Sequence, residues 1–239
     1  WGAGRREMAE FLAPFGYVGV DVGKDEAPAR FEGAVFSNEL FDALPVDVAK
    51  RRDGAWRMMR VGMKDDGFEW VDGEALGGDW FAYAERMGLQ IEEAEAWIEL
   101  PVRARGMLAE MDARLARGRV AAIDYGYTER ELRRFPMGTL MGYSRHRASE
   151  KVLENPGKQD ITAHVPFTYV MECAAELGWG EGRLRTLAGW VMDECGEEGV
   201  GRAIEGEGEV ERVKLRLKLK TILVGMGESF RVAEWRKGL

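Results

Sequence analysis

Residues 33–46 read GAVFSNELFDALPV, a short apolar run that ends abruptly in polar and acidic residues. The run GAVF has the composition of a short buried strand. Asn38 and Glu39 follow just after it, and Asp42 comes next after two apolar residues. Ligands of open α/β sheets bind in the crevice outside the carboxyl ends of the strands. The stretch therefore predicts a buried strand whose exit carries two carboxylates and an amide.

The composition of the chain indicates what kind of protein it is. Its 239 residues, 46% hydrophobic and 32% charged, suffice for one large domain or a domain with an insertion. There is no apolar run of about 18 residues and no basic-then-apolar leader, so we expect neither a membrane span nor a secretory signal. A net charge of −8 argues against a nucleic-acid partner.

The two cysteines, Cys173 and Cys195, are too few for a disulfide framework or a structural zinc site. They favour a reducing compartment. The two histidines, His146 and His164, would need further ligands at suitable spacing to hold a metal, so we expect no metal site.

The first 23 residues predict a glycine turn, a helix and a strand over 17–22 that carries Asp21. Gly2 and Gly4 would let a ligand approach the backbone at a helix N-terminus, and Asp21 is spaced to accept hydrogen bonds from ribose hydroxyls. The pattern fits a nucleoside-type cofactor and an ordinary glycine turn equally well. Glu7 breaks the GxGxxG pattern and so argues against NAD or FAD. One side of the predicted helix carries Met8, Phe11, Leu12 and Phe15.

A second strand with an acidic exit is predicted at residues 120–127, VAAIDYGY. A helical pattern over 101–117 precedes it, with Gly118 as the expected C-terminal stop. Because strands that alternate with helices indicate a parallel sheet, Asp21, Glu39 and Asp124 are expected at the carboxyl ends of its strands.

The remaining segments are predicted more coarsely. Residues 128–167 break the alternation, which favours a functional excursion. The pattern over 210–224 fits a strand or one face of a helix, and we favour the helix. The other expected elements are a hairpin around residues 65–67, helices over 167–177 (closed by Gly178) and 183–195, a mobile loop over 196–209, and a last strand after MGES.

Five motifs in register carry a resemblance to a known family. They are SNELFDALPV, AAIDYGY, GTLMGYSRHR, NPGKQDITAHVPFT and MGESFRV. Together they resemble the MidA-like family of S-adenosylmethionine-dependent methyltransferases, which includes the mitochondrial complex I assembly-factor arginine methyltransferase. The resemblance implies an α/β class I methyltransferase fold: a Rossmann-like sheet with helices on both faces and an inserted segment. Its first strand would precede Trp1.

The resemblance also implies a domain organisation and a cofactor, S-adenosyl-L-methionine. Residues 1–127 would be the cofactor-binding core, 128–180 an inserted substrate-side segment, and 181–239 the helices and strands that complete the core. The implied partner is a protein substrate, a respiratory complex I subunit for the mitochondrial member. The compartment would be the cytoplasm in a bacterium and the mitochondrial matrix in a eukaryote.

Site residues follow from the same motifs. The cofactor-binding residues implied are Gly2, Ala3, Gly4, Asp21 and Asn38. The catalytic residues implied are Asn38, Glu39, Asp42 and Asp124. The substrate-side residues implied are Tyr125, Tyr143, His146, Asp160, Thr162 and His164.

The chain also departs from the family pattern. Arg6 stands where the glycine loop has its third glycine, Pro166 replaces the acid that follows HV, and only about 11 residues separate Val22 from the GAVF strand. Besides a protein arginine methyltransferase, these departures leave open a non-catalytic assembly or binding module with the same fold. An NAD-linked oxidoreductase is a more distant alternative.

The chemistry suggests roles for the acids. Methyl transfer from a sulfonium is an in-line displacement, so the protein mainly aligns the reactants and excludes water. Glu39 and Asp42 are the candidates for a carboxylate fork that grips an acceptor guanidinium. Structural alternatives stay open: Asp42 in a helix first turn, Asp124 as a cap, and His146 and His164 satisfying loop backbone groups instead of acting as a base.

Overall fold

The computed structural model describes residues 8–21, 23–145, 147–205 and 208–239. The chain divides into two compact units, each discontinuous in sequence. Unit 1 consists of Trp1–Leu40, Glu110–Gly126 and Ala174–Leu239, and unit 2 of Phe41–Ala109 and Tyr127–Cys173. Unit 2 thus joins most of the excursion expected at 128–180 to residues that precede the VAAIDYGY strand. Both units mix helices and strands, which confirms the α/β class.

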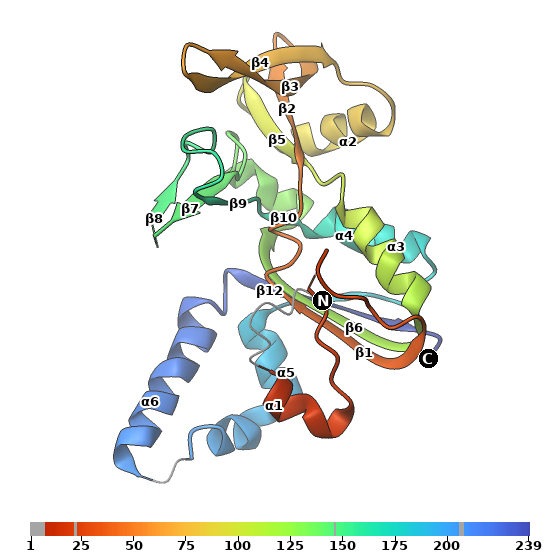
Figure 1. Cartoon of the computed structure of the whole chain (residues 1–239), viewed down its shortest axis with the longest axis vertical. Helices are drawn as coiled ribbons and strands as arrows, with labels where there is room; N and C mark the ends of the chain where they lie inside the picture. Colours follow the sequence, from red (N-terminus) through yellow and green to blue (C-terminus); the bar gives the residue numbers. More distant parts are fainter. Residues whose placement is uncertain (1–7, 22, 146, 206–207) are drawn as a thin grey trace. The chain divides into compact units, whose positions relative to one another are not determined.

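The sheet of unit 1 runs in the order β1-β6-β12-β11, and Figure 1 labels β1, β6 and β12. Its strands are β1 (Phe31–Asn38), β6 (Leu115–Tyr127), β11 (Arg183–Thr186) and β12 (Phe230–Lys237). The GAVF, VAAIDYGY and final strands are therefore confirmed. β1 and β6 pair in parallel, whereas β12 pairs antiparallel with both β6 and β11. The parallel arrangement predicted from the sequence holds for the pair that carries Glu39 and Asp124.

A close backbone approach joins β1 to β6. A Cβ on Gly118 would lie 1.8 Å from the carbonyl oxygen of Gly33, and Gly118 has a φ of +152°. Only glycine fits such a position, because any side chain would collide with main-chain atoms that cannot move aside. The prediction that Gly118 stops a helix is wrong: α3 (Ala104–Arg114) ends earlier, and β6 begins at Leu115.

The N-terminal elements differ most from expectation. The predicted helix is only a short α1 (Ala9–Leu12) followed by a 3₁₀ turn, η1 (Ala13–Phe15). Its apolar side is not covered, since Phe11 is 74% and Phe15 83% exposed. Residues 17–21 form no strand, so the strand prediction there is wrong. Among the described residues, 17–21 pair with no strand of the sheets, and an apolar pattern alone does not produce a strand.

The C-terminal helices correct two boundaries. The predicted helix over 183–195 begins only at Leu187, because residues 183–186 form β11. The resulting α5 (Leu187–Arg202) continues through part of the predicted mobile loop and breaks at Gly196, where φ is 63° and ψ is 174°. α6 (Glu209–Lys220), followed by a π turn, η3 (Thr221–Gly225), confirms helix over strand for 210–224.

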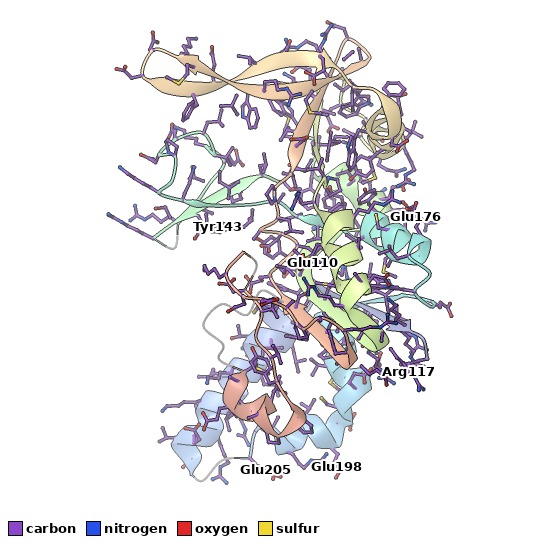
Figure 2. The ribbon with its side chains drawn as sticks, turned by 45° about the vertical axis from the view of Figure 1, so that its right-hand side comes forward. Glu110, Arg117, Tyr143, Glu176, Glu198 and Glu205 are labelled. Carbon is purple, nitrogen blue, oxygen red and sulfur yellow. The ribbon has the colours of Figure 1, made fainter. Side chains whose placement is uncertain are left out.

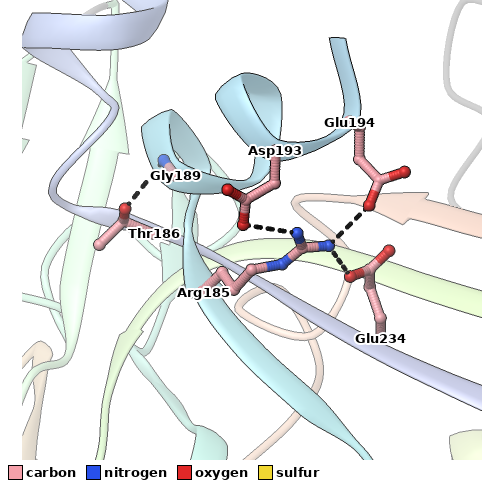
Figure 3. A network of polar contacts seen from close by, with 6 residues as sticks. All are labelled: Arg185, Thr186, Gly189, Asp193, Glu194 and Glu234. Atoms are coloured by element: carbon pink, nitrogen blue, oxygen red, sulfur yellow. Dashed lines mark hydrogen bonds and ion pairs between the residues drawn. The ribbon is translucent and has the colours of Figure 1, made fainter. Parts of the chain in front are cut away.

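One arginine fastens α5 to the sheet (Figure 3). Arg185 on β11 donates to Asp193 at 2.8 Å and to Glu194 at 3.0 Å, both on α5, and also to Glu234 on β12. Thr186 accepts a hydrogen bond from the Gly189 amide at 3.1 Å and so caps the start of α5. The start of α5 is thereby fixed against both antiparallel strands.

Unit 2 contains a four-stranded antiparallel sheet in the order β4-β3-β2-β5. Its strands are β2 (Asp47–Arg52), β3 (Ala55–Lys64), β4 (Gly67–Ala75) and β5 (Ala96–Leu100). β3 and β4 form the predicted hairpin, with Asp65 in the left-handed turn conformation at φ 52°. The core between this sheet and α2 (Gly78–Gly88) includes the buried side chains Trp56, Tyr83, Met87, Ile98 and Leu100.

The excursion after β6 builds a second, smaller sheet in unit 2. Its strands are β7 (Met141–Ser144), β8 (Arg147–Ser149) and β9 (Asp160–Thr162), in the order β8-β7-β9. A 3₁₀ turn, η2 (Glu129–Arg134), precedes it, and a short β10 (Val165–Pro166) leads into α4 (Phe167–Glu176). α4 ends just before Gly178, as predicted. Within the described ranges, no helix is long and apolar enough to cross a membrane.

Candidate functional site

The exit of β1 in unit 1 holds an acid in an unusual backbone conformation. Asn38 pairs with Ile123 in the parallel register, and the Glu39 amide donates to the Ile123 carbonyl at 2.9 Å. Glu39 has a φ of 50°, in the left-handed region that non-glycine residues seldom occupy. Its carboxylate is exposed and accepts a hydrogen bond from the side-chain amide of Asn38 at 3.1 Å. The strand thus ends in a strained turn that presents an acid to solvent.

Asp124 lies behind this turn, at the end of the neighbouring strand β6. Its side chain has 0% exposure, and one carboxylate oxygen accepts a hydrogen bond from the Leu40 amide at 3.3 Å. A buried carboxylate that binds backbone N–H groups holds the chain where it leaves the sheet. Asn38, Glu39 and Asp124 are therefore brought together, as the sequence predicted for two strand ends at one edge.

The other residues expected at the cofactor are less well matched. Asp21 lies in an irregular segment and not at a strand end. Its carboxylate accepts from the Lys24 ammonium at 2.7 Å, while its amide donates to Asp25. Gly2, Ala3 and Gly4 lie outside the described residues. Tyr125, which was predicted on the substrate side, packs edge-to-face on Phe230 of β12, with ring centroids 5.5 Å apart.

A second group of predicted site residues lies in unit 2. Asp42 is 3% exposed and sits in a turn, not in a helix first turn, so the helix-dipole alternative is wrong. Its carbonyl oxygen accepts from the Ala163 amide at 2.9 Å. Among the described residues, its buried Oδ1 has no hydrogen-bond partner. A buried carboxylate oxygen of this kind is costly unless it serves a purpose.

His164 neighbours Asp42 electrostatically. Burial lowers the pKa of His164, an effect that the negative charge of Asp42 opposes and the positive charge of Arg134 reinforces. The ring packs edge-to-face on Phe135 with centroids 5.0 Å apart. Its imidazole is therefore held mainly neutral near pH 7, which is the form that can accept a proton.

The remaining substrate-side residues lie on the small sheet of unit 2. Tyr143 pairs with Asp160 across β7 and β9, and Thr162 pairs with Met141. Tyr143, labelled in Figure 2, is 41% exposed, and Asp160 is also exposed. His146 lies outside the described residues. The predicted site residues thus form two groups whose division falls between Leu40 and Phe41.

Sequence reasoning missed a second buried acid of unit 2, Glu99. It is 3% exposed on β5, and it accepts hydrogen bonds from the Thr139 and Leu140 amides at 2.6 and 3.1 Å. The available signal was an acid inside the apolar run AWIEL. The part of the chain that the structure describes contains no cluster of three or more His, Cys, Asp or Glu placed to hold a metal.

The solved structures most informative here come from Burkholderia thailandensis. One is a COG1565 superfamily member bound to S-adenosyl-homocysteine, with a TM-score of 0.78 and 27% identity over 90% of this chain and 56% of that one. The other is an uncharacterised COG1565 superfamily protein, with a TM-score of 0.79 and 25% identity over 98% of this chain and 63% of that one. These likenesses confirm the fold class inferred from the motifs.

A curated relative is the mitochondrial protein arginine methyltransferase NDUFAF7 of Danio rerio, which is 28% identical over 160 residues. That alignment covers 64% of this chain and 34% of the relative, so the chain spans about a third of its length. Residues 17–181 match the family described as "Putative S-adenosyl-L-methionine-dependent methyltransferase". Since the match covers well over half of the residues, the chain belongs to this methyltransferase family.

Proposed function

We propose that the chain carries out S-adenosylmethionine-dependent methyl transfer and that the methyl acceptor is a protein arginine. The observation that carries the proposal is the exit of β1, where the strained Glu39 presents an exposed carboxylate next to Asn38. Strain of this kind persists only where the surroundings enforce it, and it gathers at functional sites. Family membership and the arginine methyltransferase relative support the choice of chemistry.

The residues at this edge suit the sulfonium end of the cofactor. Asn38 and Glu39 offer an amide and a carboxylate, which are suitable neighbours for a cationic group. When bound, S-adenosylmethionine supplies an electrophilic methyl group on its sulfonium. The ribose end fits less well, because the carboxylate of Asp21 already accepts from Lys24 and does not stand at a strand end.

Each acid has a separate task in this proposal. Glu39 accepts two N–H groups of a guanidinium and orients one nitrogen, since arginine and carboxylate match bidentately. Asp124 holds the Leu40 amide and thereby fixes the turn that carries Glu39. In unit 2, the buried Asp42 and the mainly neutral His164 form a separate group of substrate-side candidates, in which the imidazole can take up a proton.

A non-catalytic binding module with the same fold is the second candidate. The Asp21–Lys24 ion pair favours it, because a cofactor ribose would compete with Lys24 for that carboxylate. In this case the acidic edge of unit 1 would bind a basic segment of a partner protein without methyl transfer. Cofactor affinity separates the two candidates.

The test combines binding and transfer. S-adenosyl-homocysteine is titrated calorimetrically into the chain and into Glu39→Gln, with Glu32→Gln as the control because it is an exposed acid on the same strand. Labelled methyl transfer to an arginine-containing peptide and to its lysine counterpart is then compared. We expect the wild type and Glu32→Gln to bind S-adenosyl-homocysteine and to methylate the arginine peptide. We expect Glu39→Gln to lose this activity. Absence of S-adenosyl-homocysteine binding would support the binding module.

A further inference from the structure

Glu99 is an acid in the interior of unit 2. It lies on β5 opposite Val48 of β2, and its side chain is almost entirely buried. Burial raises its pKa, although the hydrogen bonds from Thr139 oppose this rise. An acid retained in such a place must be hydrogen-bonded to be tolerated.

Its hydrogen bonds go to one turn of the excursion. Glu99 Oε1 accepts from the amides of Thr139 and Leu140, and Gly138 adopts a φ of +78° just before them. A Cβ on Gly138 would lie 2.6 Å from the same oxygen, so the turn closes tightly around the carboxyl group. The Trp97 amide, two residues earlier on β5, donates to the Pro136 carbonyl at 2.9 Å.

The same turn holds His164. The Thr139 hydroxyl accepts a hydrogen bond from the His164 amide at 3.0 Å, and Phe135 packs against the imidazole. A continuous path therefore runs from Glu99 through the backbone and side chain of Thr139 to the backbone of His164. Every member of this path belongs to unit 2.

Glu99 and His164 also face a common cavity. It has apolar walls that include Phe41, Pro101 and Val170. Among the described residues, Glu99 Oε2 has no hydrogen-bond partner. The second oxygen thus takes no part in this hydrogen-bonded path, which we call the tether. A neutral side chain with one carbonyl oxygen could accept the same two hydrogen bonds.

We propose that Glu99 is a positioning residue for His164, which acts by holding the 138–140 turn so that Thr139 fixes the histidine backbone. The consequence for acceptor binding rests on the proposed function, whereas the tether does not. The charged groups that act on the imidazole are Asp42 and Arg134, so any movement of the ring changes its distance from both.

The test reads the histidine directly by NMR. The chain has two histidines, so His146→Gln assigns the signals of His164. We compare Glu99→Gln, whose amide oxygen can accept both N–H groups, with Glu99→Leu, which can accept none. Glu99→Gln should retain the wild-type imidazole shifts and the lowered pKa of His164. Glu99→Leu should broaden the His164 signals and move the pKa of His164 toward the ordinary value of 6.5.

A second pair of variants covers the case in which Glu99→Leu does not fold. Thr139→Ser keeps the hydroxyl acceptor and Thr139→Val removes it with little change of volume. Wild-type His164 signals in Thr139→Val, or changed signals in Glu99→Gln, would overturn the proposal. We expect Thr139→Ser and Glu99→Gln to keep the wild-type His164 signals. We expect Thr139→Val and Glu99→Leu to change them.

Steady-state kinetics separate this proposal from the proposed function. If methyl transfer occurs, Glu99→Leu should raise KM for the protein acceptor about tenfold, the loss of one ordinary hydrogen bond, with no change in KM for the cofactor. Glu99→Gln should keep the wild-type KM for the protein acceptor. If the wild type transfers no methyl group, the proposed function fails, and the NMR comparison still decides the tether.

Discussion

Asp124 and Glu99 are both buried acids near the ends of strands, but they stand in contrasting surroundings. Asp124 in unit 1 holds the Leu40 amide behind the exposed, strained Glu39. Glu99 in unit 2 is enclosed by a turn that supplies two N–H groups to one of its oxygens. The first acid lies behind a solvent-exposed turn, whereas the second belongs to an internal hydrogen-bond network.

The contrast shows that burial of an acid does not by itself identify a site. What distinguishes the β1–β6 edge is a strained acid in solvent contact next to a buried one. The Glu99 network differs because its hydrogen bonds lead through Thr139 to the backbone amide of His164. The two regions belong to different units, and each of the following experiments perturbs one of them.

The largest effect is expected from Gly118→Ala. Its Cβ would collide with the Gly33 backbone, so β1 and β6 could not pair as they do, at a cost of about 3 kcal/mol or more. Hydrogen exchange should show lost protection in β1 and β6 but not in β2–β5.

Gly106→Ala is the matched control, because nothing lies within 4 Å of its Cβ position on α3. It should stabilise the chain by about 1 kcal/mol through helix propensity. Equal unfolding free energies for the two alanine variants would contradict the close approach at Gly118.

Asp124→Ala should produce the next largest effect. It deprives the Leu40 amide of its acceptor, at a cost of about 2 kcal/mol measured by chemical denaturation. Asp124→Asn keeps a carbonyl oxygen and should cost clearly less. If the two variants are equally unstable, the carboxylate does not hold the turn through this hydrogen bond.

A gain of stability is expected from Glu39→Gly. Glycine adopts the φ of 50° without strain, so the variant should be about 1 kcal/mol more stable while it loses methyl transfer. Asn155→Gly, at φ 51° in unit 2, is the control, which should leave transfer unchanged. A Glu39→Gly variant with full transfer would remove Glu39 from the site.

The smallest effects are two opposite pH dependences in unit 2. The folded pKa of Glu99 is raised above 4.5, so its contribution to stability is present below pH 4.5 and is lost as pH rises through the folded pKa. The folded pKa of His164 is lowered below 6.5, so its contribution is present above pH 6.5 and is lost as pH falls.

Both dependences are measured as differences in unfolding free energy against pH. Wild type minus Glu99→Gln should fall with rising pH, and wild type minus His164→Gln should rise with it. Slopes of the same sign would show that one of the two groups is not buried as described.

The fold could be predicted where the local pattern and its neighbours agree. The strands of GAVF and VAAIDYGY, the hairpin around Asp65 and the helix at 209–220 were all anticipated. The strand at 17–22 was not confirmed, and Gly118 was taken for a helix stop. Both errors have the same cause, because strand formation depends on pairing partners that local sequence does not reveal.

The sequence by itself determined the family, through five motifs in register, and the meeting of Glu39 and Asp124 at one edge, because parallel strands end on the same side. Only the tertiary structure decided the strain at Glu39 and the path from Glu99 to His164. These features depend on contacts between residues far apart in the chain or on backbone geometry, and neither composition nor periodicity encodes them in a readable form.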